Sequence, residues 1–192
     1  MPQCRQSRPW TIGRRGVVGI GIAIAPFLGR PVAAADEAGL PPQPGDRFTY
    51  VVGEKKNQLI KASDLPLGGP QIQAYPIDIK TGVVRDGSRL NLLLLSRFDP
   101  SSLSEETRAR SAQGVVAYSG VCTHQGCPVT MWSSSSKVFF CSCHGSTYDP
   151  KDGAEVTGGP APRPLPSLAL AMKDDIPFVA EGFTARVGPE KH

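Results

Sequence analysis

The chain has 192 residues, of which 40% are hydrophobic and 20% are charged. This length suits one compact domain with short appendages and is too small for two full domains. The formal net charge is +4, but residues 1–35 hold five arginines and no acidic residue, which leaves 16 basic and 17 acidic residues elsewhere. The basic character therefore belongs to the N-terminal segment, and a nucleic-acid-binding surface is not expected.

The first 35 residues have the pattern of an export signal. The pair Arg14-Arg15 precedes an uncharged, mostly apolar run over residues 16–28, and small residues follow at 31–35. At 1.5 Å per residue the run spans roughly 20 Å, which is short of the roughly 30 Å hydrocarbon core of a membrane. We therefore predict a twin-arginine signal cleaved after Ala35, with an uncleaved membrane anchor as the alternative. Either form would place the protein at the periplasmic face of a bacterial inner membrane, in an oxidising compartment.

The body of the chain reads mainly as β-structure. Residues 36–45 are rich in Ala, Gly and Pro, which predicts a flexible linker, and order is expected from Asp46 onward. The run over 90–97 is nearly continuously apolar and so predicts a strand buried in the middle of a sheet. Strands are predicted over residues 47–52, with a continuation over 58–60 after a polar turn, and over 72–79, 90–97, 114–121, 129–132, 137–140, 168–172 and 178–180.

One short helix interrupts the strands. Ser102 is its predicted N-cap, because Glu105 follows three residues later, and the helix should end near Ala112. Its charged residues indicate a solvated surface insertion.

Two short stretches contain most of the chemistry. The first box, residues 122–127, reads CTHQGC, and the second box, residues 141–148, reads CSCHGSTY. They hold four of the five cysteines and two of the three histidines; Cys4 lies in the leader and His192 ends the chain. Each box should be a tight loop at the end of a strand, so that thiolates and imidazoles converge. The pattern predicts a metal site.

The ligand types leave zinc and iron–sulfur chemistry open. Cys122, His124, Cys141 and His144 form a set that a tetrahedral zinc ion would also accept. In a zinc module the remaining box cysteines would be spare thiols, whereas at one per loop they can form a disulfide that joins the loops. A catalytic Cys–His nucleophile fits the paired arrangement poorly.

Two hydroxyl residues, Ser146 and Tyr148, follow the last histidine. Bridging sulfides and thiolate sulfurs need such hydrogen-bond donors more than a closed zinc site does. This feature favours an iron–sulfur centre.

At this point the two boxes resemble the cluster-binding boxes of Rieske iron–sulfur proteins. The resemblance implies one [2Fe-2S] cluster with Cys122 and Cys141 on one iron and His124 and His144 on the other. It further implies a disulfide between Cys127 and Cys143, hydrogen bonds from Ser146 and Tyr148 to the cluster, and a covering loop at residues 159–162.

The resemblance also implies a fold and a function. The fold would be an all-β, Rieske-type antiparallel β-sandwich over residues 46–192, with a small cluster-binding subdomain at about 115–165. The protein would be an electron-transfer subunit of high reduction potential rather than a catalyst on its own. It would take electrons from quinol at a cytochrome b and pass them to a c-type cytochrome.

The identity of the complex depends on one box residue. Gln125 stands where the quinol-oxidising branch typically has leucine. This leaves a second expectation, the small subunit of an arsenite-oxidase-like enzyme, which would relay electrons from a molybdopterin subunit to a cytochrome.

Overall fold

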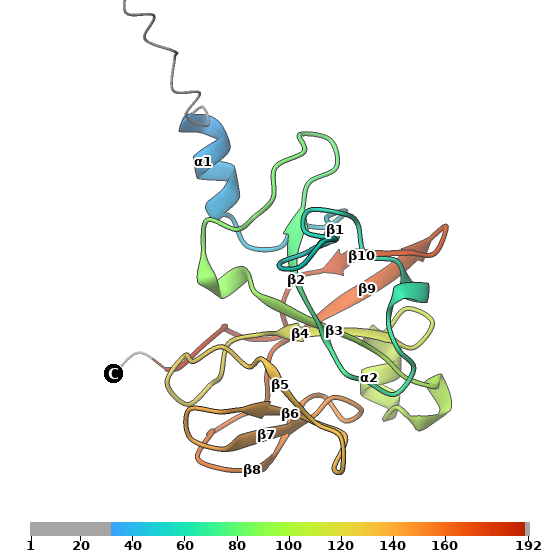
Figure 1. Ribbon diagram of the computed structural model, residues 1–192, viewed down its shortest axis with the longest axis vertical. Coiled ribbons are helices and arrows are strands. Elements are labelled where there is room, and N and C mark those ends of the chain that lie inside the picture. Colours follow the sequence, from blue (N-terminus) through green and yellow to red (C-terminus); the bar gives the residue numbers. More distant parts are fainter. Residues whose placement is uncertain (1–31, 191–192) are drawn as a thin grey trace, which may run out of the picture.

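The computed structural model describes residues 32–190, which form two antiparallel sheets and few helices (Figure 1). The arginine pair and apolar run of the predicted signal, together with Cys4 and His192, lie outside the described residues. The larger sheet has the strand order β1-β2-β3-β4-β9-β10 and the smaller one β5-β6-β7-β8. The predicted all-β fold class is therefore confirmed.

The strands are β1 Arg47–Tyr50, β2 Ile72–Ile77, β3 Leu93–Arg97, β4 Val115–Ser119, β5 Met131–Ser133, β6 Val138–Cys141, β7 Ser146–Asp149, β8 Glu155–Gly158, β9 Ser167–Lys173 and β10 Ile176–Glu181. The helices are α1 Val32–Gly39 and α2 Glu105–Arg110, and the 3-10 turns are η1 Ala62–Asp64, η2 Arg89–Asn91 and η3 Pro100–Ser102. In the part of the chain that the structure describes, these helices lack the length and apolarity that crossing a membrane would take.

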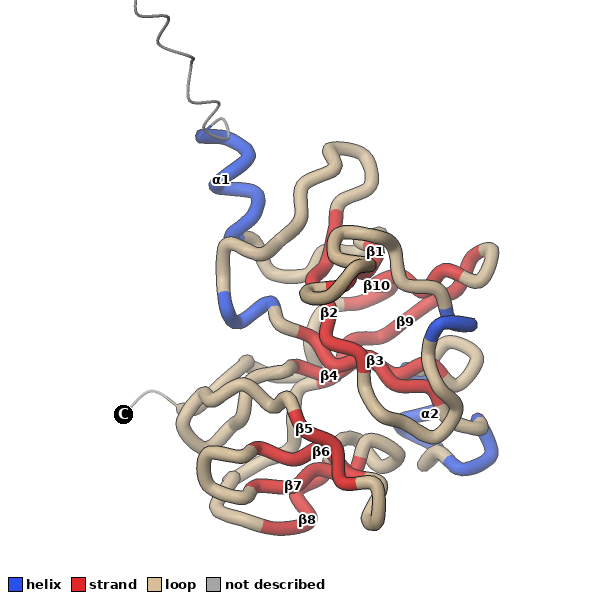
Figure 2. Tube along the Cα trace, viewed as in Figure 1, coloured by secondary structure: helices blue, strands red, loops and turns tan. Residues whose placement is uncertain are grey.

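The smaller sheet is an insertion between β4 and β9 of the larger one, and Figure 2 shows it lying below that sheet. The first and last strands of the larger sheet meet, because Gly45 N donates to Val179 O (2.8 Å) and Val179 N donates to Asp46 O (3.0 Å). These bonds cover both edges of the larger sheet locally and curl it towards closure.

The central strands β3 and β4 are buried on both faces. Leu93 and Leu95 point into a first core, while Leu94, between them, points into a second core. A strand buried on both faces needs apolar residues at consecutive positions. This confirms the predicted buried strand for residues 93–97. The start of the run was predicted wrongly, because residues 89–91 form η2 and Leu90 is 40% exposed.

The two cores divide the molecule. The first core lies within the larger sheet and consists of Phe48, Ile60, Ala62, Leu65, Ala74, Leu93, Leu95, Ala112, Val115, Ala117, Leu168, Leu170 and Val179. The second core lies between the sheets and consists of Leu94, Phe98, Leu103, Val116, Tyr118, Cys122, Val129, Phe139, Cys141, Tyr148, Ala154, Ala161 and Leu165. The first cysteine of each box thus belongs to the second core, so that folding itself positions two of the predicted ligands.

The start of α2 differs from the prediction. Asp99 caps η3, because its Oδ1 accepts from Ser101 N (2.9 Å), and Ser102 only ends that 3-10 turn. Ser104 caps α2 instead, with its hydroxyl accepting from Thr107 N at 3.4 Å. The helix ends at Arg110, where the guanidinium donates to the carbonyl of Gly182 (3.1 Å). The helix is therefore fastened to the chain beyond β10 and is more than a solvated insertion.

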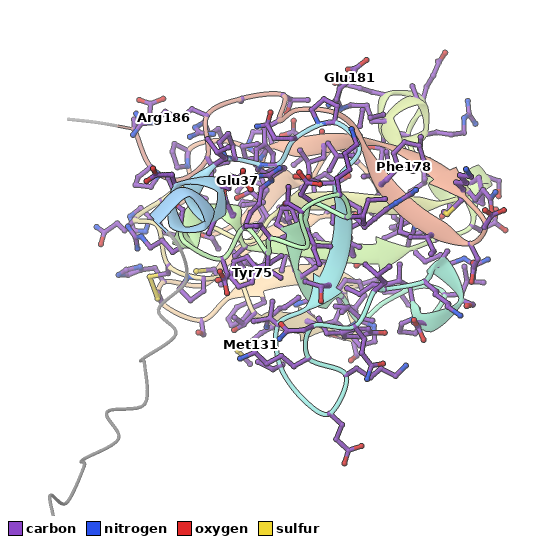
Figure 3. The ribbon with its side chains drawn as sticks, turned by 90° about the horizontal axis from the view of Figure 1, so that it is seen from above. Glu37, Tyr75, Met131, Phe178, Glu181 and Arg186 are labelled. Atoms are coloured by element: carbon purple, nitrogen blue, oxygen red, sulfur yellow. A yellow bond between two sulfur atoms is a disulfide. The ribbon has the colours of Figure 1, made fainter. Side chains whose placement is uncertain are left out.

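The N-terminal segment also differs from the prediction, since order begins before Asp46 and α1 is a second helix. Ala38 in α1 is only 2% exposed, and the Arg85 guanidinium donates to the Glu37 carbonyl (3.0 Å) and to the Asp46 carboxylate (2.6 Å); Figure 3 labels Glu37 in the blue helix. A buried guanidinium needs several acceptors, and residues 37–46 supply them. The predicted cleavage point after Ala35 falls inside α1.

Candidate metal centre

The two boxes fold into the same turn. In the first box Gly126 N donates to Cys122 O, and in the second Gly145 N donates to Cys141 O, both at 3.0 Å. Each glycine has a positive φ, 74° and 78° respectively, which a residue without a Cβ adopts readily. In each box the glycine lies four residues after the first cysteine, and this equal spacing gives two loops of like geometry. One loop follows β4, and the other joins β6 to β7.

The first cysteine of each box faces inward. Cys122 and Cys141 are 2% and 1% exposed, and both are free thiols. Burial raises the pKa of the Cys141 thiol, the backbone amide of Cys143 opposes this, and the neighbouring Cys122 side chain adds to the increase. The backbone amide of His144 also acts on the Cys141 sulfur. Two amides directed at one buried sulfur would stabilise a thiolate, which is the form that binds metal.

The histidines of the boxes lie together on the outer side. Their ring centroids are 4.7 Å apart and the ring planes are nearly perpendicular at 89°. His144 is exposed and His124 is half-buried. The Nδ1 atom of His124 is buried and has no hydrogen-bond partner among the described residues. A metal ion bound at Nδ1 would provide the partner that this buried nitrogen lacks.

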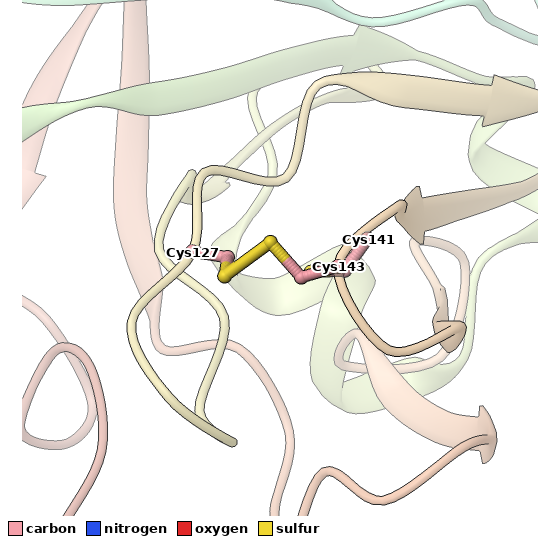
Figure 4. A group of neighbouring side chains, drawn as sticks. All are labelled: Cys127, Cys141 and Cys143. Atoms are coloured by element: carbon pink, nitrogen blue, oxygen red, sulfur yellow. A yellow bond between two sulfur atoms is a disulfide. The ribbon is translucent and has the colours of Figure 1, made fainter.

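A disulfide joins the boxes. The structure forms the Cys127–Cys143 bond that the family resemblance implies. Figure 4 shows it next to Cys141, and the three sulfur atoms lie within 4.8 Å of one another. The covalent link fixes the two loops beside one of the predicted ligands.

The hydroxyl residues of the second box lie in the interior. Tyr148 OH is 3.1 Å from Cys122 Sγ, and burial, followed by its hydrogen bond with Cys122, raises the pKa of the phenol. Tyr148 therefore remains a protonated donor at physiological pH. Ser146 Oγ is buried and lacks a partner among the described residues.

A residue that the sequence analysis did not select connects these groups. Thr123 lies between the box cysteine and histidine, and its buried hydroxyl donates to Arg163 O (2.7 Å). The same hydroxyl and the Thr123 amide each lie 3.4 Å from Tyr148 OH. Its position between the two ligands of the first box could have identified Thr123, because the tight turn of the box fixes the direction of its side chain.

The proline-rich segment contacts both boxes. A Cβ placed on Gly159, whose φ is +81°, would lie 2.5 Å from Ser146 Cα and 2.6 Å from Ser146 N. Only glycine permits this approach, because a backbone atom cannot give way as a flexible side chain can. With the Thr123–Arg163 bond, residues 159–163 therefore cover the second box and hold the first.

The donor geometry discriminates between one metal ion and two. Zinc–ligand bonds of about 2.0–2.3 Å in a tetrahedron place ligand atoms roughly 3.3–3.8 Å apart. Over residues 32–190, no three of the four predicted ligand side chains bring their ligand atoms within 4.8 Å of one another. Two buried thiols and two imidazoles on the outer side instead fit the ligand set of a cluster of two irons, and His124 Nδ1 and Ser146 Oγ are buried without a partner among the described residues.

Comparison with known proteins agrees with this geometry. A family model described as the Rieske [2Fe-2S] domain matches residues 55–169, which include both boxes. The chain is 30% identical over 166 residues to the cytochrome bc1 complex Rieske iron–sulfur subunit of Streptomyces lividans, covering 78% of this chain and 95% of that protein. The Streptomyces coelicolor protein of the same name is also 30% identical over 78% of this chain, but the match spans only 46% of its length.

A third relative bears a different name. The putative respiratory nitrate reductase subunit Rieske of Haloferax mediterranei is 44% identical over 77 residues, which cover 40% of this chain and 34% of that protein.

Proposed function

The chain belongs to the Rieske [2Fe-2S] family, whose domain carries one [2Fe-2S] cluster, and we propose that the four box ligands of this chain hold it. In this assignment Cys122 and Cys141 bind one iron, and His124 and His144 bind the other. The observation that carries the proposal is the pair of like turns, which bury the two thiols and bring the imidazole rings to 4.7 Å.

We infer that the protein is the iron–sulfur subunit of a quinol–cytochrome c reductase-like complex, and that it transfers electrons rather than catalysing a reaction on its own. The names of the Streptomyces relatives support this function. Its partners would be a quinol site on a cytochrome b and a c-type cytochrome.

The site residues favour a high reduction potential. When bound, the cluster supplies a one-electron acceptor. Neutral imidazoles in place of two thiolates leave less negative charge at the site. Tyr148, 3.1 Å from Cys122 Sγ, can donate to that sulfur when it is a thiolate, and the buried Ser146 hydroxyl can donate to a bridging sulfide. Both bonds strengthen as negative charge accumulates, so they stabilise the reduced state.

The outer imidazoles offer a path for protons. His144 is exposed, so a ring nitrogen that does not bind metal can exchange a proton with solvent or with a bound hydroquinone. A group that accepts an electron and a group that accepts a proton would thus lie at one surface, as oxidation of a hydroquinone requires.

A second candidate function rests on Gln125. This residue is exposed next to His124, so the surface that a donor would approach carries a polar amide. One relative is named as a subunit of a putative respiratory nitrate reductase. The alternative is therefore the small subunit of another respiratory oxidoreductase, such as an arsenite-oxidase-like enzyme with a molybdopterin subunit.

Purification of the tagged full-length chain from native membranes and periplasm separates the two functions. A complex containing b-type and c-type haem supports the reductase assignment, whereas molybdenum without b-type haem would replace it by the alternative. We also propose a periplasmic location. Release by osmotic shock of a chain that begins at Asp36 would support the cleaved form, and retention of the full chain in membranes would support the anchored form.

A further inference from the structure

The C-terminal tail, residues 182–190, returns from β10 to the side of the molecule that carries the boxes (Figure 1). At its start Arg110 donates to Gly182 O (3.1 Å), and Phe183 packs against the first core. Thr184 N then donates to Ser167 O (3.0 Å). These contacts fasten the first half of the tail to α2 and β9.

The second half of the tail ends against the first box. A Cβ placed on Gly126, the turn glycine of that box, would lie 3.3 Å from Pro189 Cδ. Gly188 is buried, and a Cβ placed on it would lie 3.5 Å from Val121 Cγ1, just before the box. The tail therefore packs on the backbone of the first box at its turn.

Arg163 joins the tail to the first box. Its Nη2 donates to Gly188 O, and its own carbonyl accepts from Thr123 Oγ1 at 2.7 Å. Thr123 in turn lies 3.4 Å from Tyr148 OH. One residue of the proline-rich segment thus bonds both to the tail and to the residue between the two ligands of the first box.

We propose that the tail is a strap that holds the first box closed, and that Arg163 is the positioning residue that fastens it. The Cys127–Cys143 disulfide joins the box to its partner loop, Arg89 Nη1 donates to Gly126 O (3.3 Å), and the tail packs against the same turn. The strap lies beyond residues 55–169, which the family model matches. Its effect on a bound cluster rests on the proposed ligand set, whereas its effect on the box backbone does not.

The primary test is hydrogen exchange, followed by mass spectrometry, in peptides that cover residues 120–130 of the full-length holoprotein. Arg163→Met should speed exchange there roughly tenfold, since a lost charge-assisted hydrogen bond allows a change of that order. Arg163→Lys, which keeps a donor for Gly188 O, should restore part of the protection. Arg186→Met is the matched control, because Arg186 is an exposed arginine on the same tail (Figure 3) and its loss should leave exchange unchanged.

A chain that ends at Val187 distinguishes the loss of the tail contacts from the loss of the Arg163 charge. It keeps Arg163 and the contacts of Phe183 and Thr184 but lacks the Gly188 acceptor and the Pro189 ring. This chain should match Arg163→Met in exchange, in a several-fold faster loss of the cluster's visible absorption, and in a shifted midpoint potential. Wild-type exchange over 120–130 in both folded variants would overturn the proposal. Absence of a cluster from the wild-type protein would instead overturn the proposed function and leave the exchange result decisive for the strap.

Discussion

Tyr148→Phe tests how the protein sets the potential of its cluster. The substitution removes one oxygen atom, which lies 3.1 Å from Cys122 Sγ, and leaves the aromatic ring in the second core. A hydrogen bond to a charged group is worth about 1.5–3 kcal/mol. Only the part that strengthens on reduction changes the potential, and we take this as about 1–1.4 kcal/mol.

For a one-electron couple, about 1.4 kcal/mol corresponds to roughly 59 mV. The Tyr148→Phe variant should therefore have a midpoint potential roughly 40–60 mV below that of the wild type. Protein-film voltammetry at pH 6 measures the shift directly. Iron content and the visible spectrum of the variant should stay as in the wild type, because Tyr148 is not a ligand.

Tyr118→Phe provides the matched control. Tyr118 is also buried in the second core, but its hydroxyl donates to Pro150 O (2.8 Å) and not to a sulfur. This variant should lose about 1 kcal/mol of stability with an unchanged potential. Equal potentials for wild type and Tyr148→Phe, or equal shifts in the two variants, would refute the reasoning.

Three further substitutions test the supports of the site. Gly159→Ala should destabilise the fold by about 1–3 kcal/mol in chemical denaturation, because the residue has φ +81° and its Cβ would meet the backbone of the second box; a wild-type midpoint would show that the segment can move away. Cys127→Ser opens a disulfide whose cysteines are 16 residues apart, and it should cost about 3 kcal/mol and speed cluster loss, with unchanged thermal unfolding as the contrary result. Arg85→Met leaves Asp46 buried at 3% exposure without its ion-pair partner, and it should cost about 3–5 kcal/mol in urea unfolding; a cost below about 1 kcal/mol would mean that the N-terminal segment detaches easily.

The sequence predicts best those parts of the fold in which the residue types form a simple local pattern. The central strands β3 and β4 are apolar on both faces, and the two boxes can be recognised by Cys and His residues at short, regular spacing. The strands β7 and β8 were not predicted. The buried face of β7 carries Ser146 and Tyr148, which read as box residues, and none of the side chains of β8 is fully buried.

Local hydrogen bonds account for the other differences. The carboxylate of Asp99 captures the amide of Ser101, which moves the cap of α2 from Ser102 to Ser104. Arg85 binds carbonyl and carboxylate groups of residues 37–46 from far along the chain, and no periodicity reports such a contact. The roles of Thr123 and Arg163 could not be predicted from the sequence for the same reason, because these roles depend on which backbone groups the fold brings near them.

The central claim is that the four box ligands hold a two-iron cluster. Its most direct test is metal and sulfide analysis of the purified full-length protein, combined with electron paramagnetic resonance after reduction by dithionite. The account predicts two irons and two acid-labile sulfides per chain and a Rieske-type signal in the reduced state. The His124→Ala variant should lose the bound iron and sulfide and also the signal. A colourless protein with one zinc ion per chain and no such signal would contradict it.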